Sequence, residues 1–313
     1  MSTHVDLSAL NGKSVIVVSG ASGLGLAIAK RFANSEVHVT ILDIDVPGGS
    51  QIVNELRQQG LSAQFVRCDV TAHHSRTEAF EYAIRLSPTK SLDIVALMAG
   101  VMGEPGSLVD MVIRGQQENV SQPPKLRHPA LNANLVGICN CAYLALWYMN
   151  LGSGADGQKS GTPASQEALF SKSLMLISST VAYTDVGNFA DYHTSKFGVR
   201  GLFRGLRHET PRLNIRTNCL APYFMDTPLV HNGLEAFAAA GMEPGKGFEF
   251  VDVEKVVDVA GRFAVDEGLH GRAIMIVPEP EGVVDLDDDE DGLWGGKVFK
   301  GVQERMRARG LII

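Results

Sequence analysis

A tyrosine and a lysine stand four residues apart in the segment "DYHTSKFG", residues 191–198. If this segment is helical, Tyr192 and Lys196 share one face, about one turn and roughly 6 Å apart along the axis. A lysine is a poor ion-pair partner for a neutral phenol, but its ammonium group stabilises a phenolate. The pair therefore predicts a tyrosine that releases and takes back a proton, as a general acid and base does. Two unrelated surface residues are the alternative.

A glycine-rich turn lies near the start of the chain, in "VVSGASGLGLAIAK", residues 17–30. Gly20, Gly23 and Gly25 permit a tight turn and a close approach of the backbone to a ligand. The helix that begins there offers free N–H groups and the positive end of its dipole to a pyrophosphate. Because an apolar strand precedes the glycines and a helical pattern follows them, we expect a dinucleotide-binding turn that includes Ser22 and Leu24.

Two aspartates are expected at the ends of the next two strands. Asp43 follows Gly25 by 18 residues, where a carboxylate accepts hydrogen bonds from a ribose diol and repels a 2′-phosphate. No arginine or lysine lies in the glycine turn. The sequence therefore predicts NAD rather than NADP as cofactor. Asp69 is expected at the same rim, near the adenine amino group. A helix cap at Asp43 and a plain turn at Asp69 are the competing interpretations.

Strand-like and helix-like segments alternate at intervals of about 20–30 residues, a rhythm typical of βαβ units. The pattern predicts an α/β protein with a single Rossmann-type, doubly wound parallel sheet and helices on both faces, in one domain spanning residues 1–313. The expected strands are residues 13–20, 36–45, 62–70, 92–100, 173–180, 214–222 and 271–280, and the expected helices are 24–34, 48–60, 75–86, 131–150, 192–209 and 252–265.

Two segments rich in Gly, Pro, Ser and Gln interrupt this alternation. Residues 150–172 are expected to form a surface insertion. Residues 102–130 follow the end of a strand, on the rim where open parallel sheets bind ligands, although a decorative loop is equally compatible. After about residue 280 we expect a C-terminal extension. It contains the acidic run "DLDDDEDG" at 285–292, interpreted as a solvated loop, and a last helix on the surface or at a subunit contact.

Composition restricts the partners. Of 313 residues, 45% are hydrophobic and 20% charged, and the net charge of −7 argues against binding to nucleic acid. No CxxC spacing occurs among the four cysteines, so reduced thiols in a cytoplasmic protein are expected. Neither a signal peptide nor an apolar run long enough to span a membrane is recognised. The acidic run lacks the spacing of a calcium loop, and no metal is expected.

The motifs "GASGLG", "CDV", "NANLVG", "LISST" and "YHTSK" resemble, in order and spacing, those of the short-chain dehydrogenase/reductase family, over roughly residues 10–280. Around "LMAG" and the segment 226–250, the chain has some likeness to 15-hydroxyprostaglandin dehydrogenases. The resemblance implies a nicotinamide cofactor and four catalytic residues. Ser179 would hold the substrate oxygen, Asn134 would position a water that links Lys196 to solvent, and Lys196 would also bond the nicotinamide ribose. The fourth is Tyr192.

The chemistry of these residue types agrees with the resemblance. Hydride transfer between an alcohol carbon and a nicotinamide leaves one proton to move, and a tyrosine with a pKa of about 10 is a weak base at neutral pH. Lys196 and an oxidised nicotinamide would both lower the pKa of Tyr192. A pKa lower by about two to three requires about 3 to 4 kcal/mol, which a partly buried charge one turn away can supply.

Several neighbours compete for these roles. Ser178 and Thr180 flank Ser179, but only Ser179 lies 13 residues before Tyr192, and strand alternation turns its neighbours to the opposite face. Asn132 competes with Asn134, which the "NLVG" frame favours. His193 follows Tyr192, but points about 100° away on a helix. The expected cofactor-binding residues are Gly20, Ser22, Gly23, Leu24, Gly25, Asp43, Asp69, Val70, Ala99, Gly100, Tyr192, Lys196, Pro222, Phe224 and Thr227.

The chain departs from the family pattern at three places. Val18-Ser19 replaces a Thr-Gly pair, and Leu97-Met98 replaces two asparagines. Both changes remove structural polar contacts rather than catalytic groups, so we expect them to affect cofactor affinity more than the chemistry. Tyr223 replaces the glycine after Pro222 and is expected to reshape the substrate pocket.

Residues 226–250 fall where the family places its substrate lid, and their apolar side chains suggest a sizeable apolar secondary alcohol or ketone. Packing of a helix onto the core would explain the same residues. Besides Ser179 and Tyr192, the expected substrate-binding residues are Met102, Tyr223, Leu229 and Phe237.

The sequence thus predicts an NAD-dependent alcohol dehydrogenase or ketoreductase. An NADP-linked ketoreductase of a biosynthetic pathway and a non-catalytic dinucleotide-sensing protein are the alternatives. The helix at 138–150 is apolar nearly all round, which suits contact with a partner subunit, and the resemblance implies a homodimer or homotetramer.

Overall fold

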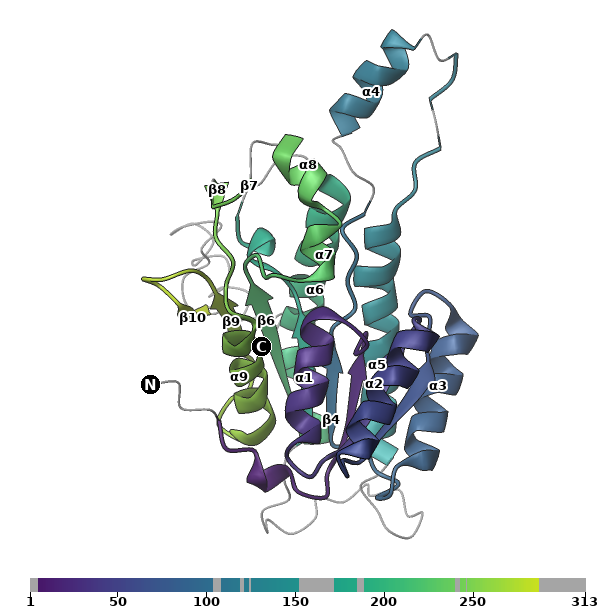
Figure 1. Cartoon of the computed structure of the whole chain (residues 1–313), viewed down its shortest axis with the longest axis vertical. Coiled ribbons are helices and arrows are strands. Elements are labelled where there is room, and N and C mark those ends of the chain that lie inside the picture. The colour runs from purple at the N-terminus through teal and green to yellow at the C-terminus, as the bar shows by residue number, and fades with distance from the viewer. Residues whose placement is uncertain are drawn as a thin grey trace, which may run out of the picture.

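Eight strands form one sheet through the middle of the protein (Figure 1). The computed structural model describes residues 5–103, 108–118, 121–123, 125–151, 172–184, 189–239, 243–245 and 247–286. The strand order is β10-β9-β6-β5-β4-β1-β2-β3, and all neighbouring pairs are parallel except β10 with β9. The order reverses between β1 and β4, the position where open parallel sheets form a ligand crevice. The predicted Rossmann-type, doubly wound sheet is confirmed.

The central strands are buried on both faces, because helices cover both sides of a parallel sheet. Every residue of β1 and of β6 is buried. This explains why β1 reads as a nearly continuous apolar run, whereas the buried Arg216, Thr217 and Asn218 of β6 need hydrogen-bond partners inside the protein. The strands are β1 Ser14–Val18, β2 His38–Asp43, β3 Ala63–Arg67, β4 Ile94–Leu97, β5 Lys172–Ile177, β6 Ile215–Pro222, β9 Ala273–Ile276 and β10 Val283–Leu286.

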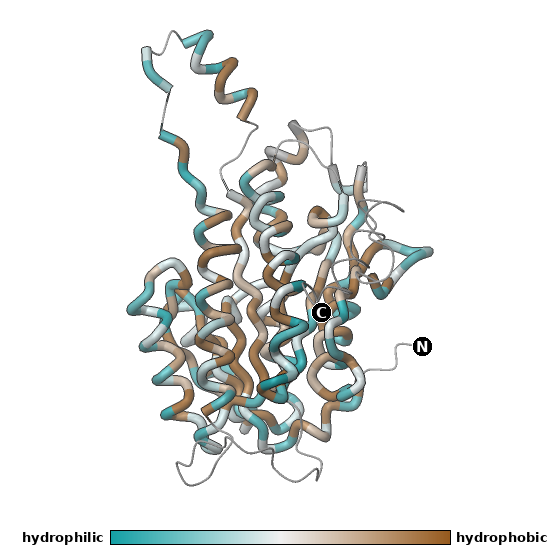
Figure 2. The backbone as a smooth tube through the Cα atoms, turned by 180° about the vertical axis from the view of Figure 1, so that it is seen from behind, coloured by the Kyte–Doolittle hydropathy of each residue, from teal (hydrophilic) through white to brown (hydrophobic). Residues whose placement is uncertain are grey.

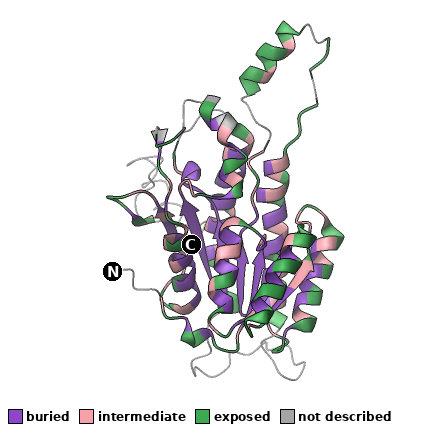
Figure 3. Cartoon of the chain, in the orientation of Figure 1, coloured by how far each residue is buried: buried purple, intermediate pink, exposed green. Residues whose placement is uncertain are grey.

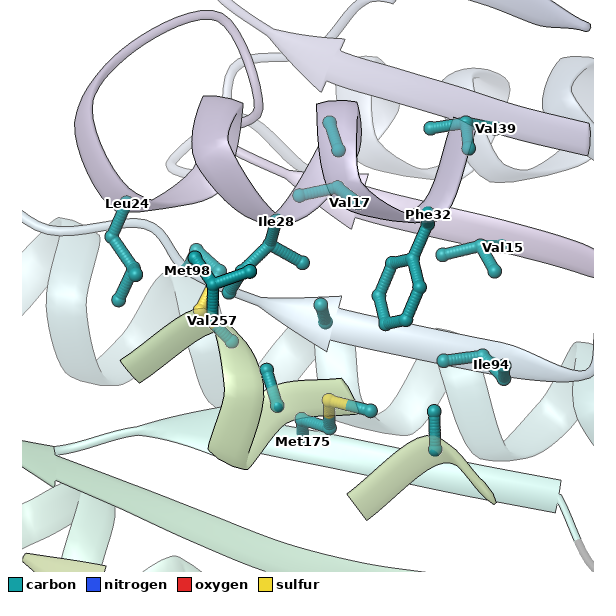
Figure 4. Packing of buried hydrophobic residues seen from close by; sticks show 14 of the residues in the cluster. Val15, Val17, Leu24, Ile28, Phe32, Val39, Ile94, Met98, Met175 and Val257 are labelled. Atoms are coloured by element: carbon teal, nitrogen blue, oxygen red, sulfur yellow. The ribbon is translucent and has the colours of Figure 1, made fainter. Parts of the chain in front are cut away.

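The helices divide into two layers. Helices α1 (Gly23–Ala33), α2 (Val46–Gln58) and α9 (Val253–Val265) bury their apolar sides in one cluster with β1 and β4. In that cluster, Phe32 of α1 points toward β4, and Val257 of α9 lies near Met98 and Ile28 (Figure 4). Helices α3 (His73–Leu86), α5 (Ile138–Leu151) and α6 (Ala190–Glu209) form the second cluster on the opposite face. Figure 3 shows the sheet buried between these two layers.

The sheet ends in a strand that the sequence analysis did not predict. β10 pairs antiparallel with β9, and Val283 lies opposite Ile276. Asp285, the first residue of the acidic run, accepts hydrogen bonds from Arg272 Nε at 2.9 and 3.1 Å. The prediction of a loop is therefore wrong at Asp285 and Leu286, which belong to β10; Arg272, just before β9, pairs with the first carboxylate. The remainder of the run, with the expected C-terminal helix, lies outside the described residues.

The predicted insertion at 102–130 contains a helix. Helix α4 (Leu108–Gln117) stands apart from the body of the protein, beyond the ends of the strands (Figure 1). Most of the insertion at 150–172 lies outside the described residues. The segment expected as a lid, residues 226–250, consists of four short elements: α7 Pro228–His231, α8 Leu234–Ala239, β7 Glu243–Pro244 and β8 Gly247–Phe248. Elsewhere in the chain, short 3-10 turns occur at Ser8–Leu10, Thr180–Ala182 and Thr210–Leu213.

The helix expected at 131–150 begins in an unusual conformation. Residues Leu131–Gly137, labelled η2, form a π-helix, and α5 continues from Ile138. Such wider turns are rare and are concentrated at functional sites. Asn134 lies within η2 and is fully buried. Among the described residues, no helix combines the length and the apolar character that a bilayer crossing requires.

The close packing of α1 on β1 makes a test of the glycine turn. A Cβ atom on Gly25 would lie 2.0 Å from the backbone oxygen of Ser19, so backbone atoms would have to move. We expect Gly25→Ala to lower the free energy of unfolding by about 2 kcal/mol or more. Gly201→Ala is the matched control, since no atom lies within 4 Å of its added Cβ in α6. That variant should gain about 0.5–1 kcal/mol, and urea unfolding measures both. Equal effects would contradict the steric argument.

Candidate active site

A cleft of about 1020 Å³ opens at the carboxyl ends of the strands. The glycine turn, the end of β5, the first turns of α6, the segment after β6 and the lid contribute its walls. Most of the residues predicted from separate motifs meet there: Ser22, Gly23, Leu24, Gly25, Gly100, Met102, Ser179, Tyr192, Lys196, Pro222, Tyr223, Phe224, Thr227, Leu229 and Phe237.

Tyr192 and Lys196 lie on the buried face of α6, as their spacing predicts. Tyr192 is 9% exposed and Lys196 only 2%. The Lys196 Nζ atom lies 5.6 Å from the centre of the Tyr192 ring and donates a hydrogen bond of 3.2 Å to the carbonyl oxygen of Ile177 at the end of β5. The pair therefore lines the cleft from within the protein, and the alternative of two unrelated surface residues is wrong.

Burial changes the proton affinities of both groups. It raises the pKa of Tyr192 to about 12, against a smaller opposing effect of the hydrogen bond with Ser179. It lowers the pKa of Lys196 to about 8. The expectation that Lys196 lowers the pKa of the phenol is wrong for the free protein, because removing both groups from water disfavours both charges.

Ser179 occupies the position expected of a substrate contact. It lies in the cleft, 8% exposed, and its Oγ accepts a bond from the Val181 amide at 3.4 Å. The competitor Ser178 instead donates its hydroxyl to the carbonyl oxygen of Lys196 at 3.0 Å, which ties β5 to α6. Thr180 begins a 3-10 turn and also borders the cleft. Of these three neighbouring residues, Ser179 is the residue whose hydroxyl hydrogen-bonds Tyr192.

Asn134 lies beneath the cleft rather than on its wall. Its Oδ1 accepts a bond of 2.7 Å from the Val101 amide, and its Nδ2 donates to the carbonyl oxygen of Val101 and to Ser195 Oγ. A Cβ placed on Gly100 would be 3.6 Å from Lys196 Nζ and 4.0 Å from Asn134 Oδ1. Both groups therefore flank the same backbone position. Asn134 links the chain after β4 to α6.

The turn between β1 and α1 fits a dinucleotide pyrophosphate. Gly23 has a φ of +51°, and Ser22, the N-cap of α1, makes no side-chain capping bond. The first N–H groups of α1 are therefore not capped by that hydroxyl, and they face the cleft that Gly23 and Gly25 line. Gly20 is buried behind the turn, where its small size lets the chain pass Ile41. These features match what an NADP or NAD pyrophosphate requires.

A second groove continues the cleft beyond Gly100 toward β2 and β3. It holds the remaining predicted cofactor residues Asp43, Asp69, Val70 and Ala99, and it shares Ser19 and Gly100 with the cleft. Asp69 Oδ1 accepts two bonds from Thr71, which lower the pKa of its carboxyl group, so the turn interpretation also holds for this residue.

Asp43 makes structural bonds that the sequence did not reveal. Its side chain is 8% exposed; Oδ2 accepts a bond of 2.9 Å from the Ala21 amide, and Oδ1 accepts one of 3.0 Å from the Asp45 amide. The carboxylate thus fastens the glycine turn and the entry to α2. Asp43 does not cap α2 itself, because the N-cap of that helix is Asp45, whose side chain accepts a bond from the Gly48 amide.

The substrate end of the cleft is apolar and aromatic. Phe237 of the lid is 3% exposed, and its ring centre lies 4.9 Å from Phe189 and 5.1 Å from Phe224. Phe189, Val181 and His193 border the cleft but were not predicted as site residues. The position of Phe189, three residues before Tyr192, was the available signal. Among the described residues, no group of His, Cys, Asp and Glu is placed to hold a metal ion.

Comparison with known proteins places the chain in a family. The model of the short chain dehydrogenase family matches residues 13–236, and the chain belongs to this family. It is an oxidoreductase whose family acts on hydroxyl and keto groups. The 5′-hydroxyaverantin dehydrogenase of Dothistroma septosporum is 39% identical over 99% of this chain and 98% of its own length. The fold also matches the F189W actinorhodin polyketide ketoreductase with NADPH, with a TM-score of 0.67 and 19% identity over 85% of this chain and 95% of that chain.

The predicted preference for NAD is wrong. An NADP-dependent dehydrogenase of Cochliobolus lunatus is 36% identical over 71% of this chain and 74% of its own length. The prediction of NAD requires the Asp43 carboxylate to be free to bind a ribose and to repel a phosphate. In the structure, both oxygens of that carboxylate already accept backbone hydrogen bonds.

The buried lysine predicts a specific pH dependence of stability. The pKa of Lys196 is about 8 in the folded protein and about 10.5 when unfolded, so the unfolded chain binds more protons between these values. The contribution of Lys196 to stability should therefore rise with pH across this window, by at most about 3 kcal/mol. Burial raises the pKa of the Cys68 and Cys141 thiols to about 12, which acts in the opposite sense in wild type and variant alike. Urea unfolding at pH 7.5, 8.5 and 9.5 should therefore show that the wild type gains stability relative to Lys196→Met as the pH rises. Parallel profiles would mean that Lys196 titrates normally.

Proposed function

We propose that the protein is an NADP-linked oxidoreductase that interconverts a secondary alcohol and a ketone on a sizeable, largely apolar substrate. The observation that carries this proposal is the buried group of Tyr192, Lys196 and Ser179 beside the glycine turn in one cleft. In this proposal the whole chain, residues 1–313, is a single catalytic domain with a lid. Among the relatives, the Dothistroma enzyme is named for a hydroxylated substrate, which supports a secondary alcohol of that class.

The residues of the cleft account for the proton in the reaction. Bound NADP would accept a hydride from the alcohol carbon, and NADPH would return it to the ketone. In the direction of reduction, the Tyr192 hydroxyl gives its proton to the substrate oxygen, while Ser179 donates a hydrogen bond that orients this oxygen. The nearby Lys196 ammonium stabilises the phenolate that remains. In the direction of oxidation, the same phenolate takes the proton of the alcohol.

An arginine beside Asp43 supplies the cation that NADP requires. Arg67 ends β3, is exposed, and pairs in register with Asp43 at the end of β2. Residues paired in this way on neighbouring parallel strands point to the same face of the sheet. We assign Arg67 to the 2′-phosphate of NADP, because it lies opposite Asp43 and two residues before Asp69, both of which line the groove. Arg67 at the end of β3 thus provides the positive charge that the glycine turn lacks.

The exposed side of α5 supports assembly into an oligomer, as the family resemblance implies. Tyr143, Trp147 and Leu151 are 63%, 54% and 62% exposed. The opposite side of the same helix is buried against the sheet. An apolar stripe of this kind on a helix suits contact with a second copy of the chain.

Hydride transfer tests the central proposal. With an alcohol panel and NADP, the wild type should form NADPH, whereas Tyr192→Phe should lose at least about 10²–10⁴-fold in kcat, because no other group at that position carries the proton. Tyr143→Phe on the exposed side of α5 is the matched control and should retain full activity. If the wild type and Tyr192→Phe are equally inert while both bind NADPH tightly, the protein is a dinucleotide sensor rather than an enzyme.

Cofactor preference tests Arg67. A charge-assisted hydrogen bond to a phosphate contributes about 1.5–3 kcal/mol, so Arg67→Ala should raise the KM for NADPH by about 10- to 100-fold and leave the KM for NADH unchanged. Arg85→Ala, an exposed residue in the last turn of α3, is the control. An equal rise for both cofactors would show that Arg67 acts on the structure and does not recognise the phosphate.

A further inference from the structure

A second cavity of about 620 Å³ adjoins the catalytic cleft. Met102, Phe189 and Tyr192 line both spaces, so the two meet beside the reacting hydroxyl. The second cavity extends away from the glycine turn, between α4, residues 125–131 and the start of α6. Its position therefore suits the far end of a substrate whose reactive carbon lies at Tyr192.

The walls of this cavity are apolar except at one side. Leu108 and Met111 of α4 line it together with Leu126 and Leu131, and Asp191, His128 and Arg127 are among its polar residues. A long apolar skeleton would bury these side chains, which are partly open to solvent.

Asp191 carries an acceptor to which no described residue donates a hydrogen bond. Its Oδ2 accepts a bond of 2.9 Å from the Ala130 amide. Its Oδ1 is buried, and among the described residues no donor forms a hydrogen bond with it; His128 Nδ1 lies 3.4 Å away in an ion-pair contact. Buried carboxylate oxygens are rarely left in this state. A hydroxyl group on a ligand in the cavity would provide the donor.

Helix α4 presents its sides unequally to this cavity. Val109 is 66% exposed and does not line it, whereas Leu108 and Met111 do. On a helix, Met111 and Val109 point in nearly opposite directions. Figure 2 shows the apolar residues of this helix, which stands apart from the main body. The inner side of α4 thus forms one wall over a space that ends at Tyr192.

We propose that the second cavity is a distal subsite, which binds the far end of an extended aromatic or polycyclic substrate and accepts a hydrogen bond from its terminal hydroxyl at Asp191 Oδ1. This inference rests on the proposed function and adds the class of substrate. The subsite selects length through Leu108 and Met111, and it selects a hydroxylated end through Asp191. It takes no part in the hydride or proton step.

Three alcohols with the same reacting centre test the proposal: 1-phenylethanol, 1-(biphenyl-4-yl)ethanol and 1-(4′-hydroxybiphenyl-4-yl)ethanol. In the wild type, the KM should fall along this series. Met111→Glu should raise the KM of both biphenyl alcohols about tenfold and leave that of 1-phenylethanol unchanged. Val109→Glu, which places the same charge on the outer side of α4, should leave all three unchanged. Asp191→Asn should abolish the advantage of the hydroxylated biphenyl over the plain one.

The outcomes separate this inference from the proposed function. If the wild type oxidises none of the alcohols, the proposed function fails. Calorimetric titration of the NADPH-loaded protein with the matching ketones then gives the same comparison by binding alone. If Met111→Glu and Val109→Glu affect the biphenyl compounds equally, or if the wild type shows no preference for length, the distal subsite is wrong. An unchanged preference for the hydroxyl in Asp191→Asn contradicts the role of Asp191.

Discussion

The burial of one ammonium group constrains the rest of this structure. Lys196 is almost fully enclosed, and removing a charge from water costs several kcal/mol unless polar groups replace the solvent. The carbonyl oxygen of Ile177 and the ring of Tyr192 replace part of it. These partners belong to β5 and α6, so the two elements must keep their mutual position for the lysine to remain where it is. The bond from the Ser178 hydroxyl to the Lys196 carbonyl oxygen holds the same two elements together.

The burial of this site also changes how readily Tyr192 and Lys196 ionise. Burial disfavours a charged phenol and a charged amine alike, which raises the pKa of Tyr192 and lowers that of Lys196. With a pKa of about 12 the phenol stays neutral unless a positive charge lies nearby, whereas Lys196, with a pKa of about 8, still carries its proton at neutral pH. A proton transferred at the substrate oxygen is therefore coupled to the charges brought into the cleft, and solvent has little influence on it. The rings of Phe189, Phe224 and Phe237 form an aromatic wall, which also keeps water away from these two groups.

Much of the fold and the central pair were predictable from the sequence, because periodicity and motif spacing are local signals. Tyr192, Lys196 and the glycine turn met in one cleft as expected. What the sequence could not show was the direction of individual polar atoms. Asp43 stands at the position of a ribose-binding residue, yet its oxygens accept backbone bonds from Ala21 and Asp45. Arg67 lies 24 residues further along the chain and becomes its neighbour only when β2 pairs with β3. Likewise, α4 lies in a segment whose Gly and Pro content is typical of a loop, and β10 includes the start of an acidic run, where Asp285 pairs with Arg272.

The π-helical segment η2 limits how this chain can vary in length. Its wider turns place Asn134 between Val101 and Ser195 while leaving the inner side of α5 against the sheet. An i→i+5 turn holds one residue more than an i→i+4 turn, so loss of a single residue from 131–137 would restore an ordinary helix and leave the residues after it close to their present orientation. Cys141 and Ala145 would then stay in the core. A one-codon deletion would therefore keep the packing of α5 but displace Asn134 from Val101 and Ser195.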